Sequence, residues 1–174
     1  MSGLLRNTLI GLTTAGGIAA AVIAFFEGYE PTPYKDPIGI LTVCVGHTGA
    51  NTDATRVYTR EECQSLLEGD LGDALASVDL RVTVPLGEKT RAALASFVFN
   101  VGDGAFSRST LLRKLNAGEG VAACDELLRW TYAGGKELPG LVKRRQFERE
   151  LCRDGFTTND NIPVPLARPE RRRA

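Results

Sequence analysis

The chain has 174 residues, which is long enough for one domain with a substantial hydrophobic core. Lys and Arg together number 21, and so do Asp and Glu, so the formal net charge is zero. A neutral chain has no general electrostatic attraction for nucleic acid, and we expect no nucleic-acid partner. The basic run at 171–173 is local. It lies in a polar, proline-punctuated stretch, and we expect residues 154–174 to form a disordered tail.

An uncharged run of 20 residues, Asn7 to Phe26, follows Arg6 and ends directly on Glu27. As a helix with a rise of ~1.5 Å per residue it would be about 30 Å long, which matches the core of a bilayer. More than half of its residues are small or weakly polar. Such a helix would be held only weakly in lipid.

Three interpretations of this run compete. It could be a cleaved signal peptide, with small residues near Ala21 as the cleavage site. It could be a helix of the protein core, although its glycines lower the helix propensity. We favour the third, a signal anchor at 1–26 that inserts, exports the rest of the chain and later leaves the bilayer. Arg6 favours an N-terminus inside and a domain outside.

The remaining pattern predicts an α+β fold. Tyr34 to His47 is apolar and β-branched around turn residues, which indicates a small sheet. Thr59 and Glu62 form a capping box that opens a long helix at 59–79. This helix would join a small N-terminal β-sheet lobe to a larger helical lobe. The helical lobe contains a nearly all-apolar, buried helix at 88–101 and shorter helices at 109–116, 121–130 and 140–153.

Glu27 would end the first helix, with Gly28 at the position that stops it. The negative end of a helix and the neighbouring Phe25 and Phe26 both favour a protonated carboxyl, which a general acid needs. Asp36 lies nine residues on in a polar turn and should stay ionised. Two carboxyls in different environments are typical of glycosidases. Alone, however, this spacing is a weak signal, and it is more typical of two surface acids that flank a loop.

The two carboxyls belong to a wider set of motifs along the chain. These motifs are Glu27-Gly28, Tyr34-Lys35-Asp36, Gly39, Thr42, Gly46-His47, Thr59-Arg60-Glu61-Glu62, Phe97 to Gly102, Arg129 to Tyr132 and Gly140 to Arg149. Together they resemble the phage-type lysozymes, the muramidases that phages use as endolysins. The similarity covers roughly 25–152, and the weakly apolar N-terminus further resembles the signal-anchor-release endolysins. We therefore expect a lysozyme-like catalytic domain at 27–153.

The resemblance implies hydrolysis of the β-1,4 bond between N-acetylmuramic acid and N-acetylglucosamine in peptidoglycan, without a metal or another cofactor. Glu27 matches the general acid, Asp36 the carboxylate that orients water, and Thr42 the hydroxyl that helps to hold this water. The family is regarded as inverting. The alternatives are a membrane-tethered, non-catalytic peptidoglycan-binding protein and a secreted lysozyme with a cleaved signal peptide.

Three further residues are candidates for substrate binding. Asn100 could face the cleft and bind sugar. His47, the single histidine, matches a family histidine at the sheet, for which a structural role is the first interpretation. Trp130 could stack on sugar, but core packing is the more common role of a lone tryptophan. Arg144 and Arg145 could meet acidic parts of the wall peptides, although a solvated helix face is the default interpretation.

The chain contains four cysteines, which allow two disulfides in three pairings. Four reduced, buried thiols are the alternative, and export favours disulfides. We expect Cys44–Cys63, which would tie the sheet to the connecting helix, and Cys124–Cys152, which would tie two later helices together. Cys44 departs from the family pattern, because many relatives have glycine there.

The location of the run at 7–26 would then control the activity of the enzyme. With 7–26 in the inner membrane, Glu27 would be pinned at the outer face of this membrane, away from Asp36 and Thr42. After release into the periplasm, the last turns of the run would dock on the sheet and bring Glu27 to the cleft. We expect the enzyme to act as a monomer.

Overall fold

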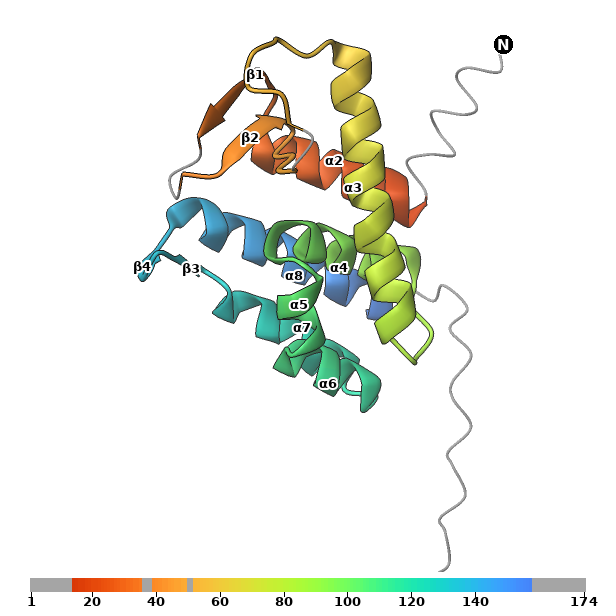
Figure 1. Ribbon diagram of the computed structural model, residues 1–174. Coiled ribbons are helices and arrows are strands. Elements are labelled where there is room, and N and C mark those ends of the chain that lie inside the picture. The colour runs from red at the N-terminus through yellow and green to blue at the C-terminus, as the bar shows by residue number, and fades with distance from the viewer. Residues whose placement is uncertain (1–13, 36–38, 50–51, 158–174) are drawn as a thin grey trace, which may run out of the picture.

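The computed structural model describes residues 14–35, 39–49 and 52–157, and within them the predicted α+β architecture is confirmed (Figure 1). In chain order the elements are α2 (Ala15–Glu27), β1 (Glu30–Lys35), β2 (Leu41–Cys44), α3 (Arg60–Arg81), α4 (Glu88–Val101), α5 (Asp103–Ser107), α6 (Thr110–Asn116), α7 (Gly120–Asp125), the 3₁₀ helix η1 (Glu126–Arg129), β3 (Tyr132–Ala133), β4 (Lys136–Glu137) and α8 (Pro139–Thr157).

Helix α4 lies at the centre of the helical lobe, as its all-apolar sequence predicts. Every residue from Ala92 to Val98 is buried. The helix packs against α2, α3 and α8, so its whole circumference is covered (Figure 1). A helix that is apolar on all sides is stable only in such a position. It is therefore the common support for the elements that carry the candidate site.

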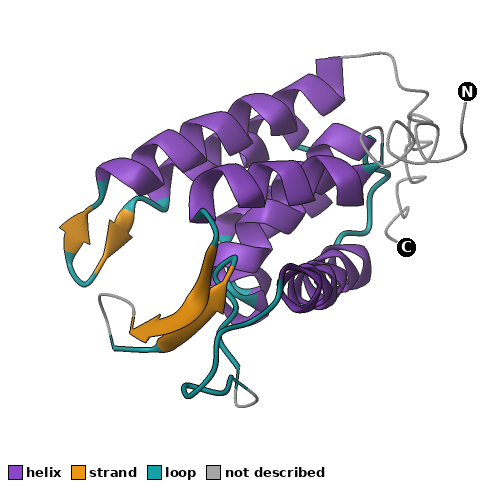
Figure 2. Cartoon of the chain, turned by 90° about the horizontal axis from the view of Figure 1, so that it is seen from above, coloured by secondary structure: helices purple, strands orange, loops and turns teal. Residues whose placement is uncertain are grey.

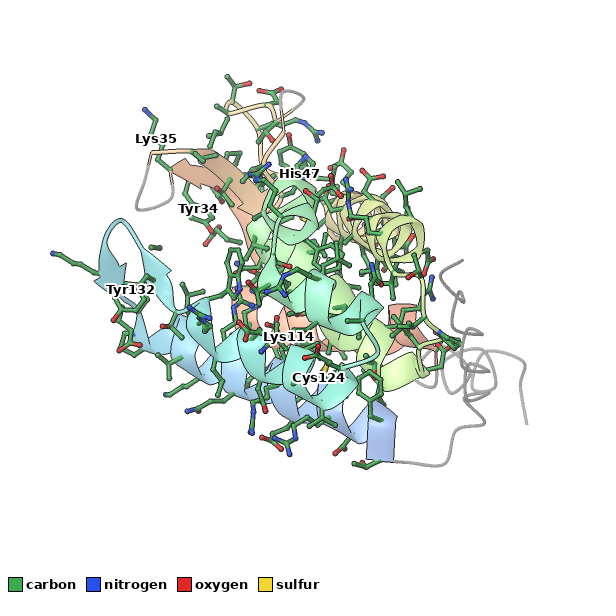
Figure 3. All side chains as sticks on the ribbon, turned by 90° about the horizontal axis from the view of Figure 1, so that it is seen from below. Tyr34, Lys35, His47, Lys114, Cys124 and Tyr132 are labelled. Atoms are coloured by element: carbon green, nitrogen blue, oxygen red, sulfur yellow. A yellow bond between two sulfur atoms is a disulfide. The ribbon has the colours of Figure 1, made fainter. Side chains whose placement is uncertain are left out.

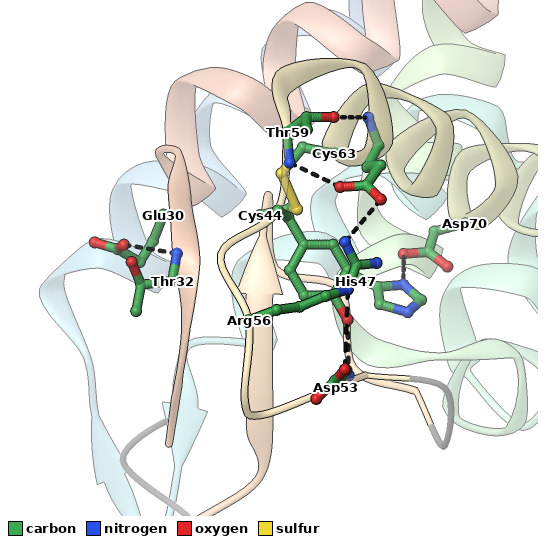
Figure 4. The surroundings of a disulfide bond; sticks show 11 residues. Glu30, Thr32, Cys44, His47, Asp53, Arg56, Thr59, Cys63 and Asp70 are labelled. Carbon is green, nitrogen blue, oxygen red and sulfur yellow. Dashed lines mark hydrogen bonds and ion pairs between the residues drawn. A yellow bond between two sulfur atoms is a disulfide. The ribbon is translucent and has the colours of Figure 1, made fainter.

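Helix α3 begins with the predicted capping box (Figure 4). The Thr59 hydroxyl accepts from the backbone N–H of Glu62 at 3.2 Å, and the Glu62 carboxylate accepts from the backbone N–H of Thr59 at 2.8 Å. The helix runs two residues beyond its expected end. It connects the β1–β2 hairpin to the helical lobe, as the sequence indicated.

Helix α2 contains the last part of the uncharged run, and it is docked on the domain. Ala15, Ala19 and Ile23 are fully buried against residues of α3 and α4, among them Leu71 and Ala92. A helix that presents small side chains to its neighbours can approach them closely.

The start of the predicted anchor, 1–13, lies outside the described residues, as do Asp36 and the stretch 158–174. Within the described parts of the chain, we find no helix with the length and apolar character needed to cross a membrane.

The sheet lobe is a two-stranded antiparallel hairpin in which Tyr34 pairs with Thr42 and Lys35 with Leu41. A second short hairpin, β3–β4, was not predicted, although Gly134 and Gly135 at its turn both have positive φ and are a common hairpin signal. Both hairpins lie on the same side of the molecule (Figure 2). The exposed rings of Tyr34 and Tyr132 therefore lie on that side as well (Figure 3).

The helices after α4 differ in part from the prediction. Gly102 ends α4 as expected, but α5 follows at once, where no helix was predicted. The single helix expected at 121–130 is instead α7 followed by the 3₁₀ helix η1. Helix α8 continues to Thr157, so the first four residues of the expected tail belong to a helix. The Cys124–Cys152 disulfide near this end ties the helix to α7. The local composition does not reveal this constraint.

Both predicted disulfides are present, and no described cysteine is free. Cys44 of β2 bonds to Cys63 of α3 (Figure 4). Cys124 of α7 bonds to Cys152 of α8. Cys44 has a φ of 62°, the only positive value at a non-glycine residue among the described residues. Glycine adopts this conformation without a steric penalty, so a glycine would fit the backbone at this position.

Candidate active site

Glu27 is the last residue of α2, and Gly28 ends the helix with a φ of 74°. The Glu27 side chain is 23% exposed and lies against the loop that follows β2. A Cβ atom at Gly46 would stand 3.2 Å from Oε2 of Glu27, and the φ of Gly46 is 77°. The absence of a side chain at Gly46 therefore leaves the space that the carboxyl occupies.

Arg144 of α8 holds the other oxygen of this carboxyl. Its Nη1 donates to Oε1 of Glu27. Its Nη2 donates to the backbone oxygen of Ser96 at 3.1 Å, and its Nε donates to Oε1 of Glu148 at 3.0 Å. All three nitrogens of the guanidinium thus have partners, and the side chain is only 4% exposed. The carboxyl of Glu27 therefore meets a fixed cation and not a mobile surface group.

A second buried arginine shares this network. Arg145 donates from Nη1 to Oε2 of Glu148, from Nη2 to Oδ1 of Asn100, and from Nε to the backbone oxygen of Trp130 at 3.1 Å. Burial lowers the pKa of the Arg145 guanidinium, and the charge of Glu148 works in the opposite direction. A guanidinium stays charged even so. The network is thus a buried cluster of ions between α4 and α8.

The expectation that Arg144 and Arg145 lie on a solvated helix face was wrong, because both are buried. The sequence contains a signal that could have shown this. Arg144, Glu148 and Cys152 are spaced by four residues and share one face of α8, so the buried disulfide at Cys152 indicates that this face points inward. Arg144 and Glu148 are the residues of the site that sequence reasoning missed.

The electrostatics of Glu27 differ from the simple expectation. The helix end and the two phenylalanines were expected to favour the neutral acid. Phe25, however, is 79% exposed, and the Phe26 ring lies 5.8 Å from the Arg144 guanidinium. The Arg144 guanidinium places a buried positive charge beside the Glu27 carboxyl. The carboxyl therefore lies between the end of a helix and a guanidinium.

Thr42 lies in β2 and is 4% exposed. Its hydroxyl donates to the backbone oxygen of Ile40 at 3.2 Å, which leaves the hydroxyl oxygen able to accept a further hydrogen bond. Asp36 lies outside the described residues. Lys35, directly before it, is the last residue of β1 and pairs with Leu41.

A cavity of about 230 Å³ lies between the loop after β2 and helices α3 and α4, and Gly46 is one of its lining residues. The glycine that contacts the Glu27 carboxyl therefore also lines this cavity. The cavity has polar and apolar parts, as a sugar-binding surface requires. The residues that line it are Gly46, Thr48, Asp70, Asp73, Ala74, Ser77, Val98, Phe99, Gly102 and Asp103.

Comparison with known proteins shows the family to which this geometry belongs. The family model described as Phage lysozyme matches residues 24–148. The chain belongs to the phage lysozyme family. A SAR-endolysin of Bacteriophage PS119 is 46% identical over 160 residues, which are 87% of this chain and 96% of that relative. A SAR-endolysin of Enterobacteria phage P21 is 43% identical over 156 residues, 85% of this chain and 94% of the relative.

Solved structures show the same relationship. A crystal structure of a mutant of P22 lysozyme shares 33% sequence identity, with a TM-score of 0.66 over 77% of this chain and 94% of that one. Membership of the phage lysozyme family identifies the chain as a muramidase, a glycoside hydrolase whose substrate is peptidoglycan. The predictions of family, fold and enzyme class are thus confirmed.

Within this lysozyme fold the three candidate substrate-binding residues have different positions. Nδ1 of His47 lies 2.7 Å from Oδ2 of Asp70, a residue that lines the 230 Å³ cavity (Figure 4). Asn100 is exposed, and Arg145 bonds its side-chain oxygen. Trp130 packs at 5.2 Å on the ring of Phe97 and is half-buried. His47 and Trp130 thus have structural contacts, while Asn100 joins the exposed edge to the buried ion cluster.

Proposed function

We propose that this lysozyme cleaves the β-1,4 bond between N-acetylmuramic acid and N-acetylglucosamine with Glu27 as the general acid. Asp36 would orient the attacking water, and Thr42 would help to hold it. One observation carries the proposal. The Glu27 carboxyl lies at the end of a docked helix, held between Gly46 and Arg144, and Gly46 lines the adjacent cavity.

In this mechanism Glu27 gives its proton to the leaving oxygen, and water attacks the opposite face of the sugar while the Asp36 carboxylate takes up a proton from this water. An inverting enzyme of this kind separates its two carboxyls by roughly 6.5–9.5 Å to make room for the water. The Thr42 hydroxyl donates to the backbone of Ile40, so its oxygen would accept from that water. The negative charge of Asp36 would stabilise the positive charge that develops on the sugar.

The test measures the loss of turbidity of purified peptidoglycan by the released protein. Glu27→Gln and Asp36→Asn should each abolish lysis, and Glu30→Gln is the matched control. Glu30 is an exposed acid three residues beyond Glu27, and its carboxylate accepts only from the nearby Thr32 backbone among the described residues. If Glu27→Gln lysed at the wild-type rate, the assignment of the general acid would be wrong. Binding without lysis in the wild type would favour a non-catalytic wall-binding protein.

We also propose that the uncharged run first spans the inner membrane and then leaves it, so that the enzyme is silent until α2 docks. The 13-residue helix α2 is about 20 Å long at ~1.5 Å per residue, too short for a bilayer core of about 30 Å. Its buried face is engaged with α3 and α4, so the docked helix is not available to lipid. The name SAR-endolysin, carried by relatives that match most of this chain, supports the proposal.

The N-terminus of α2 adds to this argument. Glu88 of α4 accepts a hydrogen bond from the backbone N–H of Ala15, and the Thr14 hydroxyl accepts from Gly17 at 3.2 Å. These groups satisfy N–H groups that the first turn of a helix leaves free. In one continuous helix through 7–26, the N–H of Ala15 would instead bond to the carbonyl of Gly11. Docking therefore supplies hydrogen-bond acceptors for the first turn of α2, which a continuous membrane helix would not need.

Ala21 and Ala24 allow a test, because both are exposed on docked α2 and lie outside its buried face. Ala21→Leu/Ala24→Leu should keep the protein longer in the membrane fraction and delay lysis. Ala21→Ser/Ala24→Ser should release the protein from the membrane fraction earlier and bring lysis forward. The purified, released variants should have equal activity. Lysis on the wild-type schedule while the leucine variant is still in the membrane would contradict the proposed control by location.

A further inference from the structure

Glu148 is a fully buried carboxylate with no part in the proposed chemistry. It accepts from the Ser96 hydroxyl at 2.7 Å, from Nε of Arg144 at 3.0 Å and from Nη1 of Arg145. A buried charge is costly unless it is paired and hydrogen-bonded, and here both conditions are met. Glu148 is therefore a carboxylate that both buried arginines share and that also bonds Ser96 of helix α4.

The orientation of Arg144 depends on this carboxylate. A guanidinium is planar, so fixing two of its nitrogens fixes the direction of the third. Glu148 holds Nε and the backbone oxygen of Ser96 holds Nη2, which leaves Nη1 directed at Glu27. Without Glu148 the guanidinium could turn about its long side chain. The contact with Glu27 would then lose its fixed geometry.

The charge near Glu27 depends on Glu148 as well. Arg145 bonds to the neutral oxygens of Trp130 and Asn100, so among the described residues Glu148 is its only anionic hydrogen-bond partner. If Glu148 were neutral, Glu27 would face two uncompensated guanidinium charges. With Glu148 ionised, Glu27 faces an excess of one positive charge.

The other described neighbours of this cluster add no excess positive charge. Helix α4 contributes the neutral side chains of Ser96 and Asn100, which bond to Arg144 and Arg145. The loop after β2 contributes Gly46, and the next residue, His47, is bonded to Asp70. Among the described residues, the charges that this cluster presents to Glu27 are thus those of Arg144 and Arg145, with Glu148 behind them.

We infer that Glu148 is a positioning residue for the proposed general acid: it directs the Arg144 guanidinium at Glu27 and neutralises Arg145, so that Glu27 faces one excess positive charge. The inference rests on the proposed role of Glu27. It extends the site from the carboxyl that meets substrate to a buried carboxylate on the far side of Arg144. Glu148 itself touches neither substrate nor reacting atoms.

The first variant is Glu148→Gln, which keeps the shape of the side chain and removes its charge. Because Arg144 is then less firmly directed, kcat for peptidoglycan should fall by roughly 10-fold or more, with KM little changed. Because a carboxyl beside more positive charge gives up its proton at lower pH, the alkaline limb of the pH–activity profile should move to lower pH. Glu150→Gln is the matched control, since Glu150 is exposed on the same helix and should change neither quantity.

The second variant changes the charge near Glu27 in the opposite direction. Arg145→Gln removes a buried positive charge and leaves Glu148 in place, so the alkaline limb should move to higher pH. The double variant Arg145→Gln/Glu148→Gln restores the balance, and its limb should return close to the wild-type position. Arg145→Gln and the double variant differ only at Glu148. This pair therefore provides the test even if Glu148→Gln alone does not fold.

Unchanged kcat and an unchanged pH profile in folded Glu148→Gln would overturn the inference. A uniform loss of activity, with the limb in place in all three variants, would also overturn it and leave Glu148 a purely structural residue. The proposed function fails separately. Full activity of Glu27→Gln removes the general acid, whereas an inactive Glu27→Gln beside a wild-type-like Glu148→Gln removes only the role of Glu148.

Discussion

The Arg144 guanidinium donates to the Glu27 carboxyl across 117 residues of sequence. This bond joins the middle of α8 to the last residue of α2, and both helices pack on the central α4. The position of the carboxyl thus depends on the docking of α2 and on the arginine that receives it. A helix that leaves the domain takes Glu27 away from Arg144 and from Gly46 together.

We predict that Arg144→Lys lowers lytic activity by roughly 10-fold or more, although the charge is kept. Lysine has one nitrogen on a flexible chain, so it cannot bond Glu27, Ser96 and Glu148 with the fixed geometry of a guanidinium. The measurement is the initial rate of turbidity loss, divided by the folded fraction from circular dichroism.

Arg149→Lys is the control for this substitution. Arg149 lies on the same helix but forms an exposed pair with Asp125 at 2.6 Å, and exposed pairs contribute little to stability. Its activity should match the wild type. Equal activities of the two lysine variants would show that the guanidinium geometry at Arg144 is unimportant.

We predict that Gly46→Ala abolishes most activity while the protein still folds. The added Cβ would stand 3.2 Å from Oε2 of Glu27, so the carboxyl must move.

Gly118→Ala separates this effect from backbone strain. Its φ of 83° is similar to that of Gly46, but nothing lies within 4 Å of its Cβ. Both variants should lose about 1 kcal/mol of stability from the left-handed backbone, and only Gly46→Ala should lose activity. Comparable activity in the two variants would contradict the importance of the Gly46–Glu27 contact.

The features that local sequence determines were predictable. The capping box at Thr59 and the all-apolar pattern of 88–101 each depend on neighbouring residues, and both elements formed where expected. Glu27 was correctly placed at a helix end, because Gly28 is a strong stop signal. The even cysteine count indicated two disulfides in three possible pairings, and the pairing that we expected is the one present.

The features that depend on tertiary packing were not predictable in this way. Taken alone, Arg144 and Glu148 look like an ordinary exposed helix pair, and in the sequence only their shared helix face with Cys152 indicates otherwise. Only the packing of α8 on α4 makes this pair the buried support of Glu27. The contact between Gly46 and Glu27 likewise joins separate elements, so no local pattern indicates it.

The left-handed conformation of Cys44 leads to a prediction about stability. Cys44→Ser/Cys63→Ser should be less stable than the wild type by about 3 kcal/mol, because it loses the disulfide. Cys44→Gly/Cys63→Ser loses the same bond, but glycine accepts a φ of 62° without a steric penalty. It should be more stable than the serine pair by about 1 kcal/mol. Urea unfolding with Cys124–Cys152 intact measures the difference. A serine variant that equals or exceeds the glycine variant would argue against strain at Cys44.

Asp103 should make stability dependent on pH in the acid range. Hydrogen bonds from Arg81 and Ser77, each 2.5 Å long, lower the pKa of Asp103 to about 2 from an ordinary value of 3.8. A lowered folded-state pKa stabilises the protein above 3.8, and this contribution is lost as the pH falls toward 2. Asp103→Asn should therefore unfold at a lower temperature than the wild type near pH 6, and the difference should become much smaller as the pH falls to about 2. In an Arg81→Gln background, Asp103→Asn should have little effect at either pH, since the main partner of the carboxylate is gone. Melting temperatures of the four proteins between these pH values give the answer, and a gap that stays constant down to pH 2 would rule out the link between Asp103 and acid stability.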